Sequence, residues 1–102
     1  MVFTDPTPLN ASIRNVTFAP GAHNNWHSHK IGQVLLVTGG EGWYQEEGKP
    51  AQLLKTGDVV NIPPHVKHWH GATKDNWFVH LAITPGETDW LEPVDDEWYK
   101  KL

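Results

Sequence analysis

The stretch GAHNNWHSHKIGQVLLVTGG, residues 21–40, decides the fold, because it places His27 and His29 one residue apart in chain that reads as extended. In an extended strand, residues i and i+2 project from the same face, so one strand can offer both imidazoles to a single point. A second pair, His68 and His70, follows about forty residues later, and Gln33 lies between the two pairs. This pattern predicts a metal ion held inside a small β-barrel.

Short apolar runs separated by turn residues predict an all-β fold. Glycine and proline recur at short spacing, as in Pro20-Gly21, Gly39-Gly40 and Pro63-Pro64, and strands punctuated in this way are typical of a sandwich or barrel. The expected strands cover residues 12–18, 31–38, 42–47, 52–54, 59–62, 68–72 and 77–83. One short helix is expected near the C-terminus, with Asp95, Asp96 and Glu97 in its first turn and Lys100 and Lys101 in its last.

The length of 102 residues indicates one domain with one modest core. Within it we expect an N-terminal arm over residues 1–11, which is either loose or packed on a partner subunit. The barrel is expected over residues 12–84, and a C-terminal extension with the short helix over residues 85–102.

The composition excludes several classes of function. The net charge is −4 and no cluster of Lys or Arg is present, so a nucleic-acid partner is not expected. No apolar stretch approaches the roughly 20 residues of a membrane span, and the N-terminus lacks the features of a secretory signal. Cysteine is absent, which removes disulfides and thiolate metal sites and agrees with a cytoplasmic protein.

The two histidine blocks resemble the paired motifs of the cupin superfamily. The first block runs Gly21, five residues, His27-Ser28-His29, three residues, Gln33, six residues, Gly40. The second block runs Gly57, five residues, Pro63, then His65, two residues, His68, three residues, Ala72. The chain departs from the superfamily pattern at Gln33, which stands in place of glutamate, at His65 in place of glycine, and at Ala72 in place of asparagine.

The resemblance can be narrowed to one group of small bacterial cupins, on the runs TFAPGAHNNWHSHKIGQVLLVT, GDVV, KHWHGA and VHLAI and the closing segment ending in DEWY. That group includes the manganese-dependent hydroxynitrile lyases of cupin fold and cupins associated with carboxymuconolactone-decarboxylase-like domains. The resemblance implies a double-sheet jelly roll, usually a homodimer. It also implies one divalent metal ion, manganese by resemblance, on His27, His29, Gln33 and His68.

The expected ligand set has a physical consequence of its own. Three imidazoles and a carboxamide oxygen are neutral, so a divalent ion keeps its full charge, whereas a glutamate ligand would reduce it. Such a centre favours an anionic or carbonyl oxygen at its open positions. Nitrogen and oxygen ligands without sulfur also suit Fe, Ni, Co or Zn, and affinity alone does not choose among them.

Two further histidines are expected to line the cavity as catalytic groups. His70 shares the face of His68, and His80 lies in the middle of an expected strand, so either imidazole could move a proton near a metal-bound substrate. The alternative is that each orients a ligand or completes a hydrogen bond in the core. His65 is expected in a loop at the barrel mouth and His23 in a surface loop.

An apolar wall for the organic part of a substrate is expected from Leu35, Val37, Trp43, Trp77 and Phe78. Leu35 and Val37 share the face of Gln33 by strand parity. The six tryptophans of the chain have a simpler explanation as filling for a small barrel and its dimer contact.

Three functions remain open from the sequence. The first is a metalloenzyme acting on a carbonyl or cyanohydrin-like small molecule, with hydroxynitrile lyase as the specific case. The second is an iron-dependent dioxygenase or isomerase acting on a small aromatic or quinone-like substrate. The third is a cupin that binds a small ligand without turnover.

Overall fold

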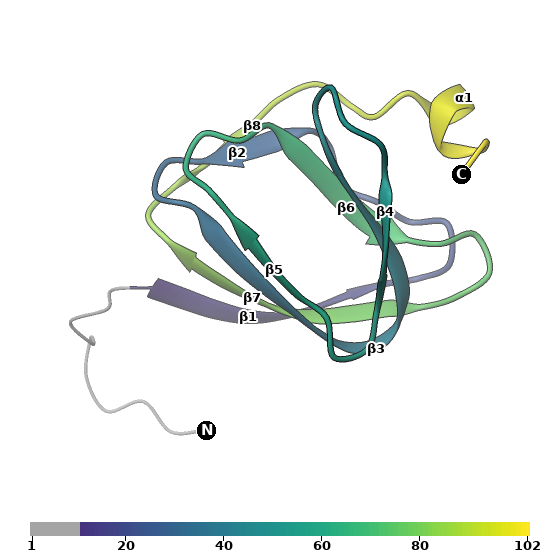
Figure 1. Ribbon diagram of the computed structural model, residues 1–102, viewed down its shortest axis with the longest axis horizontal. Helices are drawn as coiled ribbons and strands as arrows, with labels where there is room; N and C mark the ends of the chain where they lie inside the picture. Colours follow the sequence, from purple (N-terminus) through teal and green to yellow (C-terminus); the bar gives the residue numbers. More distant parts are fainter. Residues whose placement is uncertain (1–10) are drawn as a thin grey trace.

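The computed structural model describes residues 11–102, and its strands fold into one curled antiparallel sheet (Figure 1). The expected arm of residues 1–11 lies outside the described residues except for Ala11. The eight strands are β1 (Ala11–Phe18), β2 (His27–His29), β3 (Gln33–Glu46), β4 (Gln52–Lys55), β5 (Val59–Ile62), β6 (His68–Ala72), β7 (Phe78–Pro85) and β8 (Thr88–Trp90). One helix, α1 (Asp96–Tyr99), follows them. The prediction of an all-β fold with a short C-terminal helix is confirmed.

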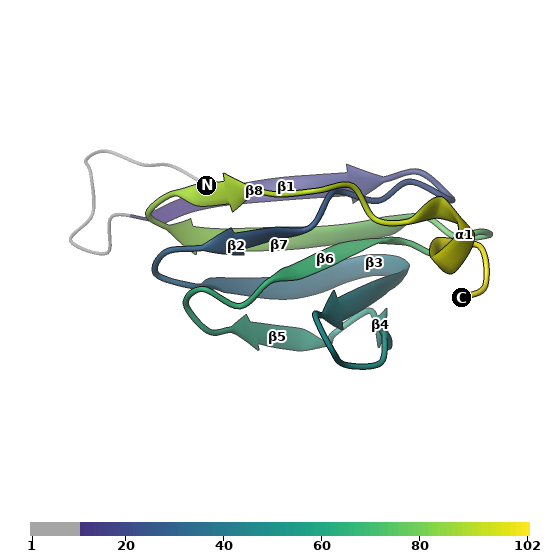
Figure 2. The same ribbon diagram turned by 90° about the horizontal axis from the view of Figure 1, so that it is seen from above.

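The strands follow the order β1-β7-β3-β6-β2-β8, with β4 and β5 paired to β3. Strand β3 is long enough to belong to both halves of the curl, pairing β5 and β7 with its first part and β4 and β6 with its second. Figure 2 shows β1 and β8 at the same height at the top of the view, where they end opposite halves of the curl, β1 beyond β7 and β8 beyond β2. Strands β1 and β8 are the two ends of the path, so each has one edge without a strand partner among the described residues.

The boundaries of two expected strands were wrong. Residues 31–38 and 42–47 form the single strand β3, because Gly39-Gly40 makes a bulge and not a turn. The register with β7 shifts between Val37 and Gly39, and the extra residue bends the strand so that it crosses from one layer to the other. The three-residue strand β8 was not expected at all.

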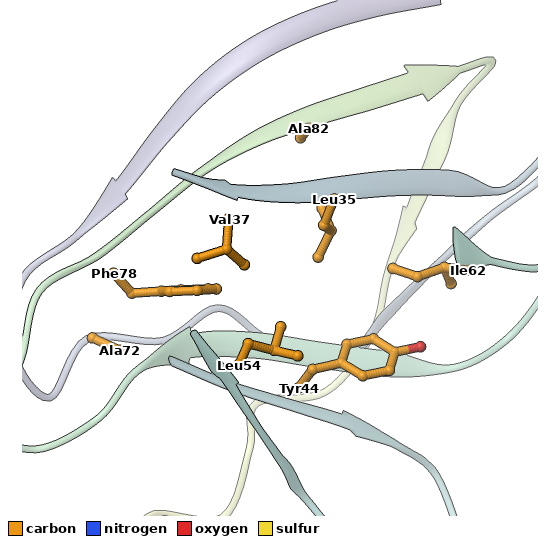
Figure 3. Close-up of a cluster of buried hydrophobic side chains, with 8 residues drawn as sticks. All are labelled: Leu35, Val37, Tyr44, Leu54, Ile62, Ala72, Phe78 and Ala82. Carbon is orange, nitrogen blue, oxygen red and sulfur yellow. The ribbon is translucent and has the colours of Figure 1, made fainter. Parts of the chain in front are cut away.

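The main core lies between the two layers (Figure 3). Leu35, Val37 and Phe78 are at most 1% exposed, and they pack against Tyr44 and Leu54 from the second half of the curl. Burying each large apolar side chain stabilises the fold by about 1.5–3 kcal/mol. This apolar cluster fills one end of the interior.

A second cluster fixes the C-terminal segment to the sheet. Trp69, Val94 and Tyr99 are buried together, with Trp43 packed against them. The Tyr99 hydroxyl donates a hydrogen bond to the carbonyl of Ala72. Asp95 caps α1 by accepting a hydrogen bond from the backbone N–H of Glu97, as expected for an acidic residue at a helix start. No helix among residues 11–102 is long and apolar enough to cross a membrane.

Gly42 tests the packing between the layers, because a Cβ atom there would lie 2.4 Å from the Phe78 ring. We expect Gly42→Ala to lower the free energy of unfolding by about 1–3 kcal/mol, the usual cost of overpacking a core. Gly39→Ala in the same strand is the matched control, since its Cβ would make an ordinary contact at 3.7 Å with Val79. Urea denaturation of both variants measures the difference, and an equal loss in the two would contradict this account.

Candidate metal centre

The short strand β2 brings His27 and His29 to the interior. Both side chains are 2% exposed, while Ser28 between them turns the other way. Strand β6 pairs with β2 so that His68 lies directly opposite His27. The ring centroids are 4.2 Å apart for His27 and His68, and 5.1 Å apart for His29 with either of them. Three imidazoles from two strands therefore meet in one place.

Each of these rings is held by a hydrogen bond at Nδ1. His27 Nδ1 lies 2.8 Å from the carbonyl of Asn25, and His68 Nδ1 lies 2.9 Å from the carbonyl of Val66. His29 Nδ1 lies 2.9 Å from the Thr88 hydroxyl oxygen. A carbonyl acceptor fixes the proton on Nδ1 and leaves Nε2 with its lone pair, which is how metal-binding histidines are commonly oriented.

Gln33 begins β3 beside this group, and its amide is oriented in the same manner. Its Nε2 donates to the Thr84 hydroxyl at 2.8 Å, and its Oε1 has no hydrogen-bond partner within residues 11–102. The buried atoms His29 Nε2 and His68 Nε2 also lack hydrogen-bond partners among the described residues. Buried polar atoms without partners are rare and costly, so three such atoms on neighbouring side chains fit a divalent cation.

His70 offers a different third ligand. The ligand nitrogens of His27, His68 and His70 all lie within 4.8 Å of one another, close enough to hold a metal ion. However, the Asn24 amide nitrogen lies 3.3 Å from His70 Nε2 and 3.5 Å from its Nδ1. The Asn24 side-chain oxygen also accepts a hydrogen bond from the His70 backbone N–H at 3.0 Å. His27 and His68 are common to both sets. Of the two alternatives for the third histidine, His29 has an anchored Nδ1 and an Nε2 without a partner among the described residues, whereas both ring nitrogens of His70 lie against Asn24.

Burial keeps these histidines neutral. Desolvation, with the neighbouring His68, lowers the pKa of His27 to about 3. Desolvation also lowers the pKa of His68 to about 4, and it lowers the pKa of His29 below its usual value. Neutral imidazole is the form that binds a metal ion, so the ligands are ready at neutral pH without losing a proton.

An open cavity of about 600 Å³ lies beside the histidines, within the size range of sites for small molecules. Its walls come from β1, β7 and β8, with His29 of β2, Gln33 of β3 and His70 of β6. They include Ser12, Arg14, Val16, Phe18, Asn24, His29, Gln33, His70, His80, Ala82, Thr84, Glu87, Thr88 and Trp90. The structure therefore brings His70 and His80, together with His29 and Gln33, to one cavity.

None of the five residues expected to form the apolar wall lines this cavity. Leu35, Val37 and Phe78 do face the interior, but they are packed in the main core. Trp43 packs in the second cluster against Trp69, and Trp77 is 58% exposed on the surface. The apolar walls are instead Phe18 and Trp90 with smaller side chains of β1 and β7.

The two remaining histidines lie away from the cavity walls. His65 is exposed in the loop after β5, as expected, and its backbone N–H donates to the carbonyl of His29 at 2.8 Å. The expectation for His23 was wrong, because its side chain is only 15% exposed. It packs on the Tyr99 ring at 4.4 Å, where Gly71 leaves room for it.

The sequence matches the cupin domain over residues 14–84, more than half of the chain. It is 43% identical over 104 residues to (R)-mandelonitrile lyase from Granulicella tundricola, a match that covers 98% of this chain and 79% of that protein. The chain belongs to the cupin family. The family explains why both histidine blocks face one interior.

The structural comparisons agree. A cupin-like protein from Thermotoga maritima is 51% identical, with a TM-score of 0.88 over 92% of this chain and 74% of that chain. The dimethylsulfoniopropionate (DMSP) lyase DddQ from Ruegeria pomeroyi shares the cupin fold at 22% identity and a TM-score of 0.73, over 85% of this chain and 46% of that one. Acireductone dioxygenase from Bacillus pumilus is 25% identical over 75 residues, 70% of this chain and 43% of its own length.

The metal content of single variants distinguishes the two ligand sets of this cupin. We expect His29→Ala and His68→Ala to lose most of the bound metal after purification with Mn(II), because each removes a candidate ligand. We expect His70→Ala to keep the wild-type stoichiometry, and His65→Ala serves as an exposed control. Elemental analysis measures the outcome; full metal in His29→Ala with loss in His70→Ala would assign the centre to His27, His68 and His70.

Proposed function

We propose that this cupin is a metal-dependent lyase that breaks or forms a carbon–carbon bond at a small carbonyl compound, as in the cleavage of a cyanohydrin. Support comes from the similarity to (R)-mandelonitrile lyase, which extends over nearly the whole chain. The observation that carries the proposal is His80, whose two buried ring nitrogens have no hydrogen-bond partner among the described residues. His80 lines the cavity beside the candidate metal ligands.

The residues proposed to hold the metal are His27, His29, Gln33 and His68, and the proposed ion is Mn(II). When bound, such an ion supplies Lewis acidity toward the substrate oxygen. Gln33 contributes a neutral oxygen, and the Thr84 hydroxyl fixes the direction of that oxygen by accepting from the other end of the amide. The chain therefore orients its ligands before any substrate enters.

His80 is the proposed general base. Burial lowers its pKa, so the ring is neutral at pH 7 and can accept a proton. His70 is also neutral, since burial lowers its pKa well below the usual value, but the Asn24 amide lies against both of its nitrogens. His80 therefore has the freer lone pair. His70 contacts it at 4.9 Å between ring centroids and is proposed to support it.

In the proposed cleavage of a cyanohydrin, His80 carries the proton from the substrate hydroxyl group to the leaving cyanide. A ring nitrogen of His80, Nδ1 or Nε2, removes the hydroxyl proton of the cyanohydrin, and the O–H electron pair becomes the second bond of the carbonyl. The bond between the carbinol carbon and the nitrile carbon breaks, and its electrons leave with cyanide. The proton on His80 then passes to cyanide, which gives an aldehyde and hydrogen cyanide. The space for the organic group is bordered by two aromatic side chains. The ring centroid of Phe18 lies 6.0 Å from that of His80, and the centroid of Trp90 lies 4.7 Å from that of His27.

We expect Mn(II)-loaded protein to release benzaldehyde from mandelonitrile, followed by its ultraviolet absorbance. We expect His80→Gln to lower kcat by about 10²–10⁴-fold, the usual contribution of general base catalysis, while its metal content stays at the wild-type level. His65→Ala is the matched control. The lyase proposal fails if loaded wild-type protein shows no cleavage above free Mn(II), and the role of His80 fails if the variant keeps wild-type kcat.

The pH profile tests the same base. Because burial lowers the His80 pKa below 6.5, the base stays neutral below that pH, and activity should fall only as the pH drops through the lowered pKa. The profile of kcat/KM should therefore keep its plateau below pH 6.5, over the range where the metal remains bound. A loss centred at or above pH 6.5 would contradict a buried neutral base.

A dioxygenase acting at Fe(II) is the second candidate, favoured by the similarity to acireductone dioxygenase over 75 residues. The same neutral donors and open cavity suit iron as well as manganese. Oxygen uptake by Fe(II)-loaded protein with a catechol or quinone-like substrate, in the absence of cyanohydrin cleavage, would favour this reaction over the lyase.

We also propose that the protein pairs as a homodimer through the outer face of β1, β7, β3 and β5. Ile13 and Val59 on this face are 37% and 64% exposed, and Val34, Leu36 and Ile83 between them are only partly buried. Covering such a face removes apolar surface from water. Light scattering should give twice the chain mass for the wild type and a shift toward one chain mass for Val59→Glu.

A further inference from the structure

Arg14 is the one arginine of the sequence, and it lies on the wall of the catalytic cavity. It belongs to β1, an end strand of the sheet, on the same face as Ser12, Val16 and Phe18, which also line the cavity. Its side chain is exposed and makes no salt bridge among residues 11–102. A guanidinium group with five donors therefore borders the cavity without a carboxylate to bind.

The strand register places Arg14 close to the proposed base. Arg14 lies opposite Ala82 on β7, and Val16, two residues further along, lies opposite His80. Diagonal neighbours of this kind are about 7–8 Å apart, within reach of a long side chain. Ala82 is small, so it leaves the space in front of Arg14 open toward the histidines. A small molecule can therefore span from His80 to Arg14.

The charges around the cavity favour an anion there, although the chain as a whole carries −4. Glu87 is the one carboxylate that residues 11–102 place on the cavity wall, and Lys30 already binds it at 3.1 Å. Among the described residues Arg14 is thus the charge left uncompensated in this part of the wall, and it lines the same cavity as His29 and Gln33, two of the proposed metal ligands.

We propose that Arg14 makes this cupin selective for small carbonyl substrates that carry a carboxylate group at the end remote from the reacting carbonyl. The carboxylate would bind the guanidinium by two parallel hydrogen bonds, the geometry that arginine offers and lysine does not. The reacting oxygen would then lie toward His80 and the proposed ligands. The assignment of the reacting end of the substrate rests on the proposed function. The assignment of a carboxylate to the other end rests on Arg14 alone.

The test compares two probes of nearly the same shape, one anionic and one neutral. The probes are 4-formylbenzoate and 4-formylbenzamide, whose para-substituted ring separates the aldehyde from the carboxylate or the neutral amide. Isothermal titration calorimetry with Mn(II)-loaded protein measures both affinities for the wild type, Arg14→Gln and Arg14→Lys. Lys55→Gln is the matched control, because it removes the same charge from β4, outside the cavity walls.

We expect the wild type to bind 4-formylbenzoate about tenfold more tightly than 4-formylbenzamide, a modest value for a charged hydrogen-bonded pair open to solvent. Arg14→Gln should remove that preference, Arg14→Lys should keep part of it, and Lys55→Gln should keep all of it. Raising the salt concentration should reduce the preference of the wild type.

Two results would overturn the proposal. One is equal binding of 4-formylbenzoate by wild type and Arg14→Gln, which would place the carboxylate elsewhere, for instance on the metal. The other is an unchanged preference together with a higher oligomer in Arg14→Gln, which would show that the charge only protects the β1 edge from pairing. The readout is binding, so the charge preference would stand even if neither probe's cyanohydrin were cleaved and the lyase proposal had failed.

Discussion

The burial of polar nitrogen and oxygen atoms without partners is the constraint on which the rest of this structure depends. A buried donor or acceptor without a hydrogen bond costs about 1–3 kcal/mol, and a domain is stable by only about 5–15 kcal/mol. His29 Nε2, His68 Nε2 and Gln33 Oε1 bear this cost side by side, and both nitrogens of His80 bear it in the same cavity. Such a concentration is tolerable when a ligand binds these atoms, so ligand binding and stability are linked here. The apolar cluster at the other end of the interior supplies the free energy that offsets this cost when no ligand is bound.

The sequence predicted the part of the site that depends on strand parity. An H-x-H pair in extended chain must present both rings to one face, and β2 and β6 place both pairs in the interior. Parity tells which face of a strand a side chain projects from, but not at which end of the barrel interior that side chain lies. Leu35 and Val37 illustrate this limit, because they share the face of Gln33 and yet lie in the main core. Only the register with neighbouring strands separates the apolar end of the interior from the polar end.

The residues that line the cavity could not be predicted from the sequence for a related reason. Phe18 and Trp90 meet the histidines because β1 pairs with β7 and β8 pairs with β2, and these contacts join residues that are far apart in the chain. Strand β8 has three residues, which is too short for an alternating pattern to be recognised. The bulge at Gly39 was likewise hidden, because a Gly-Gly pair is typical of a turn and becomes a bulge only when both flanking segments pair with common neighbours.

The equal spacing of the two H-x-H pairs conceals a division of roles that comes from their neighbours. His68 lies opposite His27 on β2, and its Nδ1 is anchored by the carbonyl of Val66, so its free nitrogen is directed into the histidine cluster. His70, two residues on, has a nitrogen within 4.8 Å of those of His27 and His68, but its ring also meets the Asn24 amide and the ring of His80. The proposed metal ligands and most of the other cavity-lining residues likewise come from different strands. The proposed ligands come from interior strands whose positions are fixed by pairing on both sides, whereas Arg14 and Trp90 come from the two end strands. Thr88 of β8 holds His29 by a hydrogen bond, so a change on that end strand disturbs a proposed ligand, whereas Arg14 on β1 is bonded to none of them among residues 11–102. In this fold a group on β1 that selects the substrate can therefore vary independently of the groups proposed to transform it.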